Sequence, residues 1–342
     1  MKKSKVLLYS GLYAIVSVLV CACSFHEPDS LTMDGKCIVT GSLDPGDTRV
    51  SLETTEGLSL LAKWEEMDRL DIYINDERIE KRMPISNISE DGRTCSFGID
   101  LSKEKYPGKC QMICVTENTN AVQENGELYL NASLLRSPIH KFRAPVYSFD
   151  TIDNRENVTV HFIHYQTYEV VHVRNESSED IVFSLHGYQL TGDAKTWFAS
   201  KRAIPLGGEG YSVDSRAAAD PVFESEPMTI PASGEDIVVS SYTCIGDKMT
   251  NAQMVASIDG KIVHSSNVLS SNVQFQVGHA YHIYVCWDGQ ELFYVGGLSE
   301  VDAGGNGYGS DSNGNINGTG IGYGSADTGT ITGGGSGYEN GN

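Results

Sequence analysis

The stretch VTVHFIHYQTYEVVHV, residues 158–173, decides the fold class of this chain. It is rich in Val, Ile, Phe, Tyr and Thr, which favour extended backbone, and its only candidate break is Gln166-Thr167. Shorter runs of the same kind, separated by turn signals that contain Gly, Pro or Asp, occur at residues 37–39, 50–52, 70–74 and 127–130. The pattern predicts strands along almost the whole chain.

Two hairpins are predicted in the last third of the sequence. The first joins Met254–Ile258 to Lys261–His264 across Asp259-Gly260, and the second joins Tyr281–Trp287 to Glu291–Val295 across Asp288-Gly289. Asp-Gly between alternating runs favours a two-residue turn with positive φ at both positions. No segment shows a sustained 3.6-residue apolar period, so the expected fold class is all-β, with two β-sandwich domains in tandem.

The length of 342 residues suits about two domains. The polar stretch Phe149–Asn157 follows the extended Pro145-Val146-Tyr147 segment and precedes a new apolar run. We therefore expect the boundary there, with an N-terminal β-sandwich at residues 35–149 and a C-terminal β-sandwich at residues 150–300. Each is long enough for a seven-stranded sandwich.

The first residues predict export. A basic segment, Met1–Lys5, precedes a 15-residue apolar run, Val6–Val20, which is shorter than the about 20 residues of a membrane-spanning helix. Residues 1–22 are therefore predicted to be a lipoprotein signal peptide. Ala22 directly before Cys23 is similar to a bacterial lipobox, which implies acylation of Cys23 and a tether over residues 23–34. An ordinary secreted protein with a cysteine at this position is the open alternative.

Composition and motifs exclude several classes of function. The chain has 45 acidic against 25 basic residues and a net charge of −20, whereas nucleic-acid binding needs clustered Lys and Arg. It contains no His-Glu-x-x-His, Gly-x-Ser-x-Gly or Gly-x-x-x-x-Gly-Lys motif. In a straight strand His164 and His172 lie far apart on one face and His161 on the other, so the three cannot share one metal ion. We predict a non-enzymatic protein with no catalytic residue, no metal and no cofactor.

Three tryptophans, Trp64, Trp197 and Trp287, support an alternative function. A tryptophan at a strand end either stacks on a sugar ring or covers the edge of a hydrophobic core. Both interpretations are open from the sequence. A surface glycan-binding lipoprotein that uses exposed aromatic side chains is therefore the alternative to a structural role.

Residues 301–342 differ from the rest of the chain. Glycine dominates there, and Tyr308, Tyr323 and Tyr338 recur every 15 residues. High glycine content makes ordering costly in backbone entropy, which predicts a flexible Gly/Tyr-rich repeat tail. A short stack of strands is the open alternative, because the repeat keeps its spacing.

Five short motifs carry a family resemblance. They are DTRVSL at Asp47–Leu52, WEEMDRLDIY at Trp64–Tyr73, TCSF at Thr94–Phe97, Pro145-Val146 and VTVHFIH at Val158–His164. Together they resemble the fimbrillin family of type V pilus subunits and accessory components, over about residues 35–295. Met67 stands where that family usually has Gly, and the glycine-rich tail lies outside the common pattern.

The resemblance implies two transthyretin-like β-sandwich domains and a lipoprotein of the cell outer membrane, surface-exposed or part of a fimbrium. In polymerising members a protease cuts after an Arg that follows the first strand, and a segment of the next subunit replaces that strand. Arg49 fits this position, and an uncut Arg49 in an ordinary loop is the open alternative. Asp29-Ser30-Leu31 and Asp150-Thr151-Ile152 resemble an O-glycosylation signal at Ser30 and Thr151.

The expected function is a structural and adhesive one, as a fimbrial subunit or an accessory tip or anchor component that assembles by β-strand exchange. The implied partners are other fimbrial subunits, the outer membrane through the lipid anchor, and a host protein or glycan. The role as stalk, tip or anchor and the adhesion target are left open by the sequence.

Overall fold

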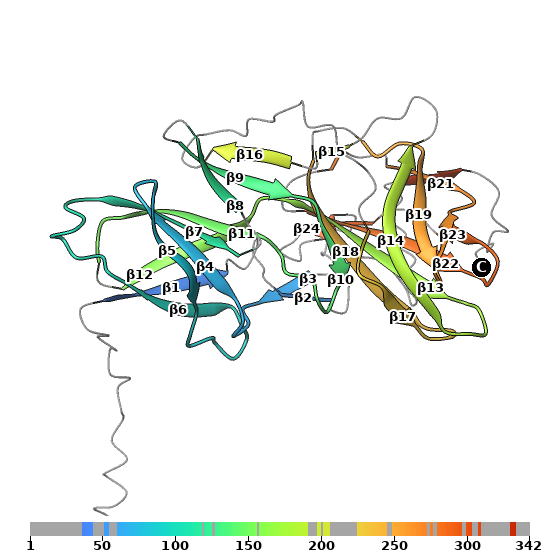
Figure 1. Cartoon of the computed structure of the whole chain (residues 1–342), viewed down its shortest axis with the longest axis horizontal. Coiled ribbons are helices and arrows are strands. Elements are labelled where there is room, and N and C mark those ends of the chain that lie inside the picture. Colours follow the sequence, from blue (N-terminus) through green and yellow to red (C-terminus); the bar gives the residue numbers. More distant parts are fainter. Residues whose placement is uncertain are drawn as a thin grey trace, which may run out of the picture.

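The structure is a computed structural model of the chain. It describes residues 36–43, 51–54, 60–117, 120–124, 127–155, 157–190, 197–199, 201–205, 224–244, 248–271, 274–275, 279–295, 299–302, 307–308 and 329–332. Every regular element in these residues is a β-strand, and no helix occurs among them. The predicted all-β class is confirmed. Figure 1 shows two β-sheet bodies side by side along the long axis.

A seven-stranded sheet forms the first body, on the left of Figure 1. Its strands in spatial order are β5 (Glu77–Pro84), β4 (Arg69–Ile74), β7 (Cys110–Thr116), β11 (Val146–Ile152), β12 (Val158–His164), β1 (Cys37–Leu43) and β6 (Thr94–Ile99). Just after β5, Ser86 exchanges two backbone hydrogen bonds with Ser96 of β6. The two edges of the sheet therefore meet, and its halves face each other across one core.

The inward side chains of this sheet share that core. Val39, Met112 and Phe162 come from three different strands and are at most 2% exposed. The Trp64 ring meets the Phe162 ring edge-to-face, with 4.9 Å between their centroids. Burial of each such side chain contributes about 1.5–3 kcal/mol, so the shared core holds the curled sheet together.

The residues expected to link two domains, 149–157, lie inside the first sheet. The stretch begins within β11 and ends directly before β12, and these are adjacent antiparallel strands with Val146 opposite His164. The long apolar run instead divides at Tyr165-Gln166, beside the predicted break, and β13 (Thr167–Asn175) enters the second body. The boundary differs from the predicted one because a polar turn within a sheet and a linker between domains have the same composition.

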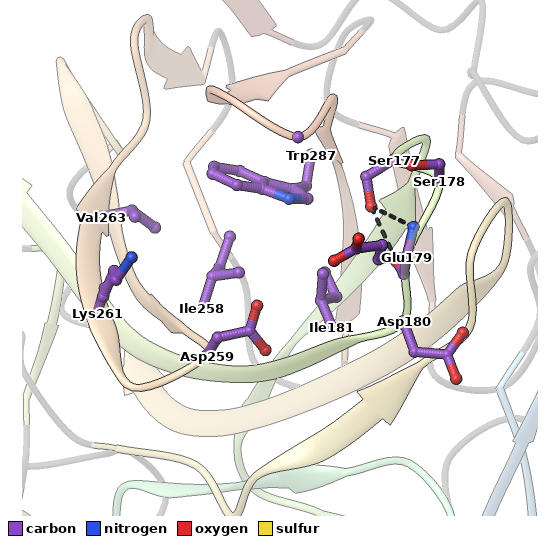
Figure 2. A pocket seen from close by; sticks show the side chains of 11 residues that line it. Ser177, Ser178, Glu179, Asp180, Ile181, Ile258, Asp259, Lys261, Val263 and Trp287 are labelled. Carbon is purple, nitrogen blue, oxygen red and sulfur yellow. Dashed lines mark hydrogen bonds between the residues drawn. The ribbon is translucent and has the colours of Figure 1, made fainter.

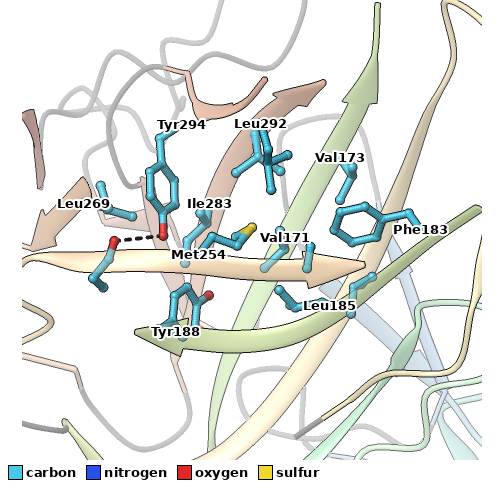
Figure 3. Close-up of a cluster of buried hydrophobic side chains, with 14 of the residues drawn as sticks. Val171, Val173, Phe183, Leu185, Tyr188, Met254, Leu269, Ile283, Leu292 and Tyr294 are labelled. Atoms are coloured by element: carbon cyan, nitrogen blue, oxygen red, sulfur yellow. Dashed lines mark hydrogen bonds between the residues drawn. The ribbon is translucent and has the colours of Figure 1, made fainter. Parts of the chain in front are cut away.

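The second body is a sandwich of two sheets. One contains β10 (Leu135–Pro138), β18 (Glu235–Cys244), β13, β22 (His279–Trp287), β24 (Ser299–Asp302) and β25 (Gly307–Tyr308), with β15 (Phe198–Ala199) on β18 and β23 (Leu292–Tyr294) on β22. The other contains β17 (Met228–Ile230), β14 (Ile181–Leu190), β19 (Ala252–Ile258), β21 (Val268–Ser271) and β26 (Gly329–Thr332), with β20 (Lys261–His264) on β19. The facing side chains of these two sheets form one core. Figure 3 shows Val171 of β13 and Ile283 of β22 packed against Phe183 of β14 and Met254 of β19.

Both predicted hairpins are present. β19 and β20 meet across Asp259 (φ 51°) and Gly260 (φ 77°), which is the two-residue turn that was predicted. β22 and β23 pair with Trp287 opposite Leu292, so their loop has four residues rather than two. The Asp288 carboxylate explains the longer loop, because it accepts backbone hydrogen bonds from Gln290 and Glu291, each at 2.8 Å.

The chain passes between the two bodies more than once. After the first sheet's β7 it forms a small sheet of β8 (Asn120–Glu124), β9 (Glu127–Ser133) and the later β16 (Lys201–Pro205), then contributes β10 to the second body, and only then returns to β11. Between β10 and β11, Phe142 packs against Tyr168 of β13. Its neighbour Arg143 pairs with Glu65 of the first body, with Nη2 2.5 Å from Oε2. The connection therefore fastens the two bodies to each other.

Part of the glycine-rich tail adds to sheet edges. β24 and β25 extend the sheet beyond β22, and β26 pairs with β21 so that Ile331 lies opposite Leu269. The other tail residues, the signal peptide and residues 23–34 lie outside the described residues. A fifth, two-stranded sheet joins β2 (Ser51–Thr54) to β3 (Leu60–Lys63).

Candidate functional site

The first strand among the described residues, β1, is an interior strand of the first sheet. It runs parallel to β12, with Val39 opposite Val158, and antiparallel to β6, with Val39 opposite Phe97. Its last residue, Leu43, donates a backbone hydrogen bond of 2.9 Å to the carbonyl of Arg93. In a simple meander, each strand pairs only with the strands next to it in the sequence, and the first strand lies at an edge of the sheet. β1 is instead held on both sides, because one of its neighbours, β12, comes more than a hundred residues later.

The inward face of β1 has a specific shape. Val39 and Leu43 are at most 2% exposed and lie in the core. Between them, a Cβ at Gly41 would come within 3.0 Å of both Cys95 Sγ and Phe162 Cε2, so these larger neighbours fill the space that a side chain would occupy. The groove between β6 and β12 therefore fits a strand with the pattern apolar-x-Gly-x-apolar.

The predicted modification and processing residues are mostly outside the described part of the chain. Cys23, Ser30 and Arg49 fall there, so lipidation, glycosylation at Ser30 and processing stay predictions. Thr151 is described. It lies in β11 opposite Gln111, and its side chain is exposed to solvent.

Two of the three tryptophans are unsuited to sugar stacking. Trp64 is 2% exposed in the first core, and Trp197 is fully buried in the second. Both belong to hydrophobic cores, so neither presents a free ring face to a ligand. Trp287 differs, since it is half-buried and lines an open cavity at the end of β22.

A buried carboxylate, which sequence reasoning missed, lies in the second core. Glu169 of β13 is completely buried and accepts hydrogen bonds from Tyr188 Oη (2.9 Å), Tyr242 Oη (3.0 Å) and Trp197 Nε1 (3.3 Å). Burial raises its pKa, while the nearby Arg136 guanidinium and these hydrogen bonds act in the opposite direction. The signal was present as one acidic residue in the apolar run TYEVVHV. A fully hydrogen-bonded carboxylate closed off from solvent stabilises a core rather than reacting with a substrate.

Two histidines from different strands also meet. His172 Nε2 of β13 lies 2.8 Å from His282 Nδ1 of β22, and His172 Nδ1 lies 3.1 Å from Glu235. The sequence could not show this contact, because it depends on the parallel pairing of β13 with β22. In the described part of the chain, no group of three or more His, Cys, Asp or Glu side chains is arranged to hold a metal ion.

The described thiols are unreactive in character. Burial raises the pKa of Cys114 and of Cys286 to about 12, so both are protonated at neutral pH. A protonated, buried thiol is a poor nucleophile. Among the described residues there is also no helix of the length and apolarity that crossing a membrane requires.

Comparisons with known proteins give structural similarity only. No protein-family profile and no curated protein matches the sequence. The fold is similar to that of a proposed cell adhesion protein from Bacteroides ovatus, with 11% identity and a TM-score of 0.43, over 78% of this chain and 95% of that chain. It is also similar to a proposed cell adhesion protein from Bacteroides uniformis, with 8% identity and a TM-score of 0.43, over 79% and 100%. A fimbrial protein from Bacteroides vulgatus matches with 9% identity and a TM-score of 0.36, over 70% and 94%.

Proposed function

We propose that this protein is a structural, adhesive lipoprotein of the cell surface, a fimbrial subunit or an accessory tip or anchor component, that assembles by β-strand exchange at the place of β1. The observation that carries the proposal is the place of β1 in the fold. It is an interior strand that lies near the N-terminal end of the chain, so a single cut after it is enough to release it. Arg49, in the stretch that follows β1, supplies a site for that cut.

Release of β1 would leave the first sheet in a state that favours association. Removing Val39 and Leu43 from the core forfeits about 3–6 kcal/mol of apolar burial. The facing backbone edges of β6 and β12 would lose their hydrogen-bond partners at the same time. A strand from a second copy restores both, which is the physical basis of assembly by strand addition.

The groove also sets what the incoming strand must look like. It needs apolar side chains at the positions of Val39 and Leu43 and Gly at the position of Gly41, because Cys95 and Phe162 occupy the space between. In this proposal acylated Cys23 anchors the uncut precursor in the outer membrane, and the exposed Thr151 is open to glycosylation.

The test uses the mature protein and an Arg-specific protease, with Arg49→Ala as the matched control. We expect cleavage at Arg49, shown by mass spectrometry, and a ladder of SDS-resistant oligomers that the Arg49→Ala protein does not form. An excess of the peptide spanning residues 37–43 should suppress the ladder by refilling the groove. The same peptide with Gly41→Val should not suppress it. A protein that is cut at Arg49 and stays monomeric, or an Arg49→Ala protein that polymerises equally, would overturn the proposal.

A further inference from the structure

A cavity of about 410 Å³ lies at one end of the second body (Figure 2). Its walls are the loop between β13 and β14 (residues 176–180), the Asp259-Gly260 turn and the loop after β22. β13 starts at Thr167, just after the chain leaves the first sheet, and runs nine residues to this end. At about 3.3 Å per residue, the cavity is roughly 30 Å from the first body. It is therefore separate from the β1 groove, and the inference is independent of strand exchange.

One wall of the cavity is apolar. Trp287 is half-buried, packs against the sandwich core and extends its indole into the cavity. Figure 2 shows the ring across the cavity from Ile258, with Val263 and Ile181 beside it. An indole held in place by core packing offers a rigid aromatic face at low entropic cost.

The other wall is polar and carries charges of both signs. Glu179, Asp180, Asp259 and Lys261 are exposed and line the cavity. Asp180 Oδ1 accepts a hydrogen bond of 2.9 Å from the Ala232 amide. Asp259 Oδ1 accepts a hydrogen bond of 2.9 Å from the Val182 amide. Among the described residues, neither the Glu179 carboxylate nor the Lys261 ammonium has a protein partner, so both are available to a ligand.

Hydrogen bonds made by the buried Asn175 side chain fix the loop that forms the polar wall. The buried Asn175 side chain donates hydrogen bonds to the carbonyls of Glu179 (2.8 Å) and Pro231 (3.0 Å) and accepts them from the Ser177 amide and hydroxyl. The Glu176 amide donates to the Trp287 carbonyl at 2.8 Å, which joins this loop to the aromatic wall. A site that is ordered before binding loses less entropy when a ligand arrives.

We propose that this cavity binds a neutral carbohydrate, with a sugar ring against Trp287. A sugar hydroxyl both donates and accepts hydrogen bonds, so it suits Glu179 and Asp259 as acceptors and Lys261 as a donor at the same time. A cation would meet the Lys261 ammonium, and an anion would meet three carboxylates, those of Glu179, Asp180 and Asp259. The cavity volume falls in the range of small-ligand sites, about 300–1,000 Å³.

The binding test uses the uncleavable Arg49→Ala protein, so that its outcome does not depend on strand exchange. An array of neutral glycans identifies the probes, and Trp fluorescence titration then gives their affinities. Because Trp64 and Trp197 are buried, a fluorescence change reports mainly on Trp287. We expect at least one neutral glycan to bind and to shift the emission.

Three variants then test the wall residues. Trp287→Ala and Glu179→Ala should each weaken binding by tenfold or more, while Trp287→Phe, which keeps an aromatic face, should retain part of it. Ile262→Ala is the matched control, because Ile262 is 57% exposed next to Lys261 and does not line the cavity. Thermal unfolding shows whether each variant is folded, and the Phe variant decides the question if the Ala variant is not. The proposal would be overturned if no neutral glycan binds, or if tetramethylammonium is the only probe that binds. It would also be overturned if the Trp287→Ala and Glu179→Ala variants bind glycan as tightly as the parent protein.

Discussion

Replacing Tyr188 by Phe should destabilise the second body more than the same change at Tyr294. Both hydroxyls are buried in one core. Tyr188 Oη donates to the Glu169 carboxylate at 2.9 Å, whereas Tyr294 Oη donates to the backbone carbonyl of Ala252 at 3.0 Å. The two variants lose the same atom, so their difference isolates the effect of the charged acceptor.

The expected magnitudes follow from the acceptors. A hydrogen bond to a charged group contributes about 1.5–3 kcal/mol, and one between neutral groups about 0.5–1.5 kcal/mol. Tyr188→Phe should therefore lower the free energy of unfolding by about 1–2 kcal/mol more than Tyr294→Phe. Tyr242→Phe removes another hydrogen bond to Glu169 (3.0 Å) and should resemble Tyr188→Phe.

Urea unfolding at pH 7, followed by circular dichroism, measures these differences as shifts of midpoint at unchanged slope. A pH series adds a second readout. Because burial raises the pKa of Glu169, the native state keeps a proton that the unfolded state has lost just above pH 4.5, so this residue lowers stability as pH rises through that window. Glu169→Gln should remove this contribution. Equal costs for Tyr188→Phe and Tyr294→Phe would refute the view that Glu169 organises the core.

Three further changes probe other parts of the fold. Burial raises the pKa of Asp68 to about 6, so the native state holds this proton more tightly than the unfolded state does. The native protein should therefore lose up to about 3 kcal/mol of stability as the pH rises from 4 to 6. Asp68→Asn should remove this loss, as measured by denaturant unfolding at pH 4 and at pH 6. Gly41→Ala should cost about 1–3 kcal/mol through overpacking against Cys95 and Phe162, and a thermal melt unchanged from the parent would contradict the tight fit. Gly260→Ala meets no atom within 4 Å, so its cost of about 1–2 kcal/mol should come from the positive φ alone, and Gly260→Asn should restore part of it.

Local patterns were enough to predict the strands and one of the turns. Two residues, Asp259 and Gly260, were enough to predict this hairpin turn, because few residue types adopt the positive φ that both turn positions require. The break near Gln166 was also visible, because Gln166-Thr167 is the only candidate break in the strand-forming run of residues 158–173. Asp288-Gly289 has the same composition but a longer loop, since the Asp288 carboxylate holds two further amides.

Features that depend on pairing between distant strands could not be predicted. The parallel partner of β1 is β12, more than a hundred residues later, and no local pattern specifies that choice. The same holds for the contact of His172 with His282, and for the cavity beside Trp287, which needs three separate loops to meet. From composition alone, all three tryptophans were equally good candidates for sugar stacking. Only the packing distinguishes Trp287, which lines the cavity, from the two buried tryptophans.

The repeated passage of the chain between its two bodies limits how the molecule can be divided. A fragment that ends at residue 149 would lack β12 and part of β11, and its β10 would have no β18 to pair with. A fragment that begins at residue 150 would carry β12 without its sheet and would lack Phe142, which covers Tyr168. No single scission yields two intact halves, so the two bodies should melt as one cooperative unit and be inherited together rather than shuffled as interchangeable modules.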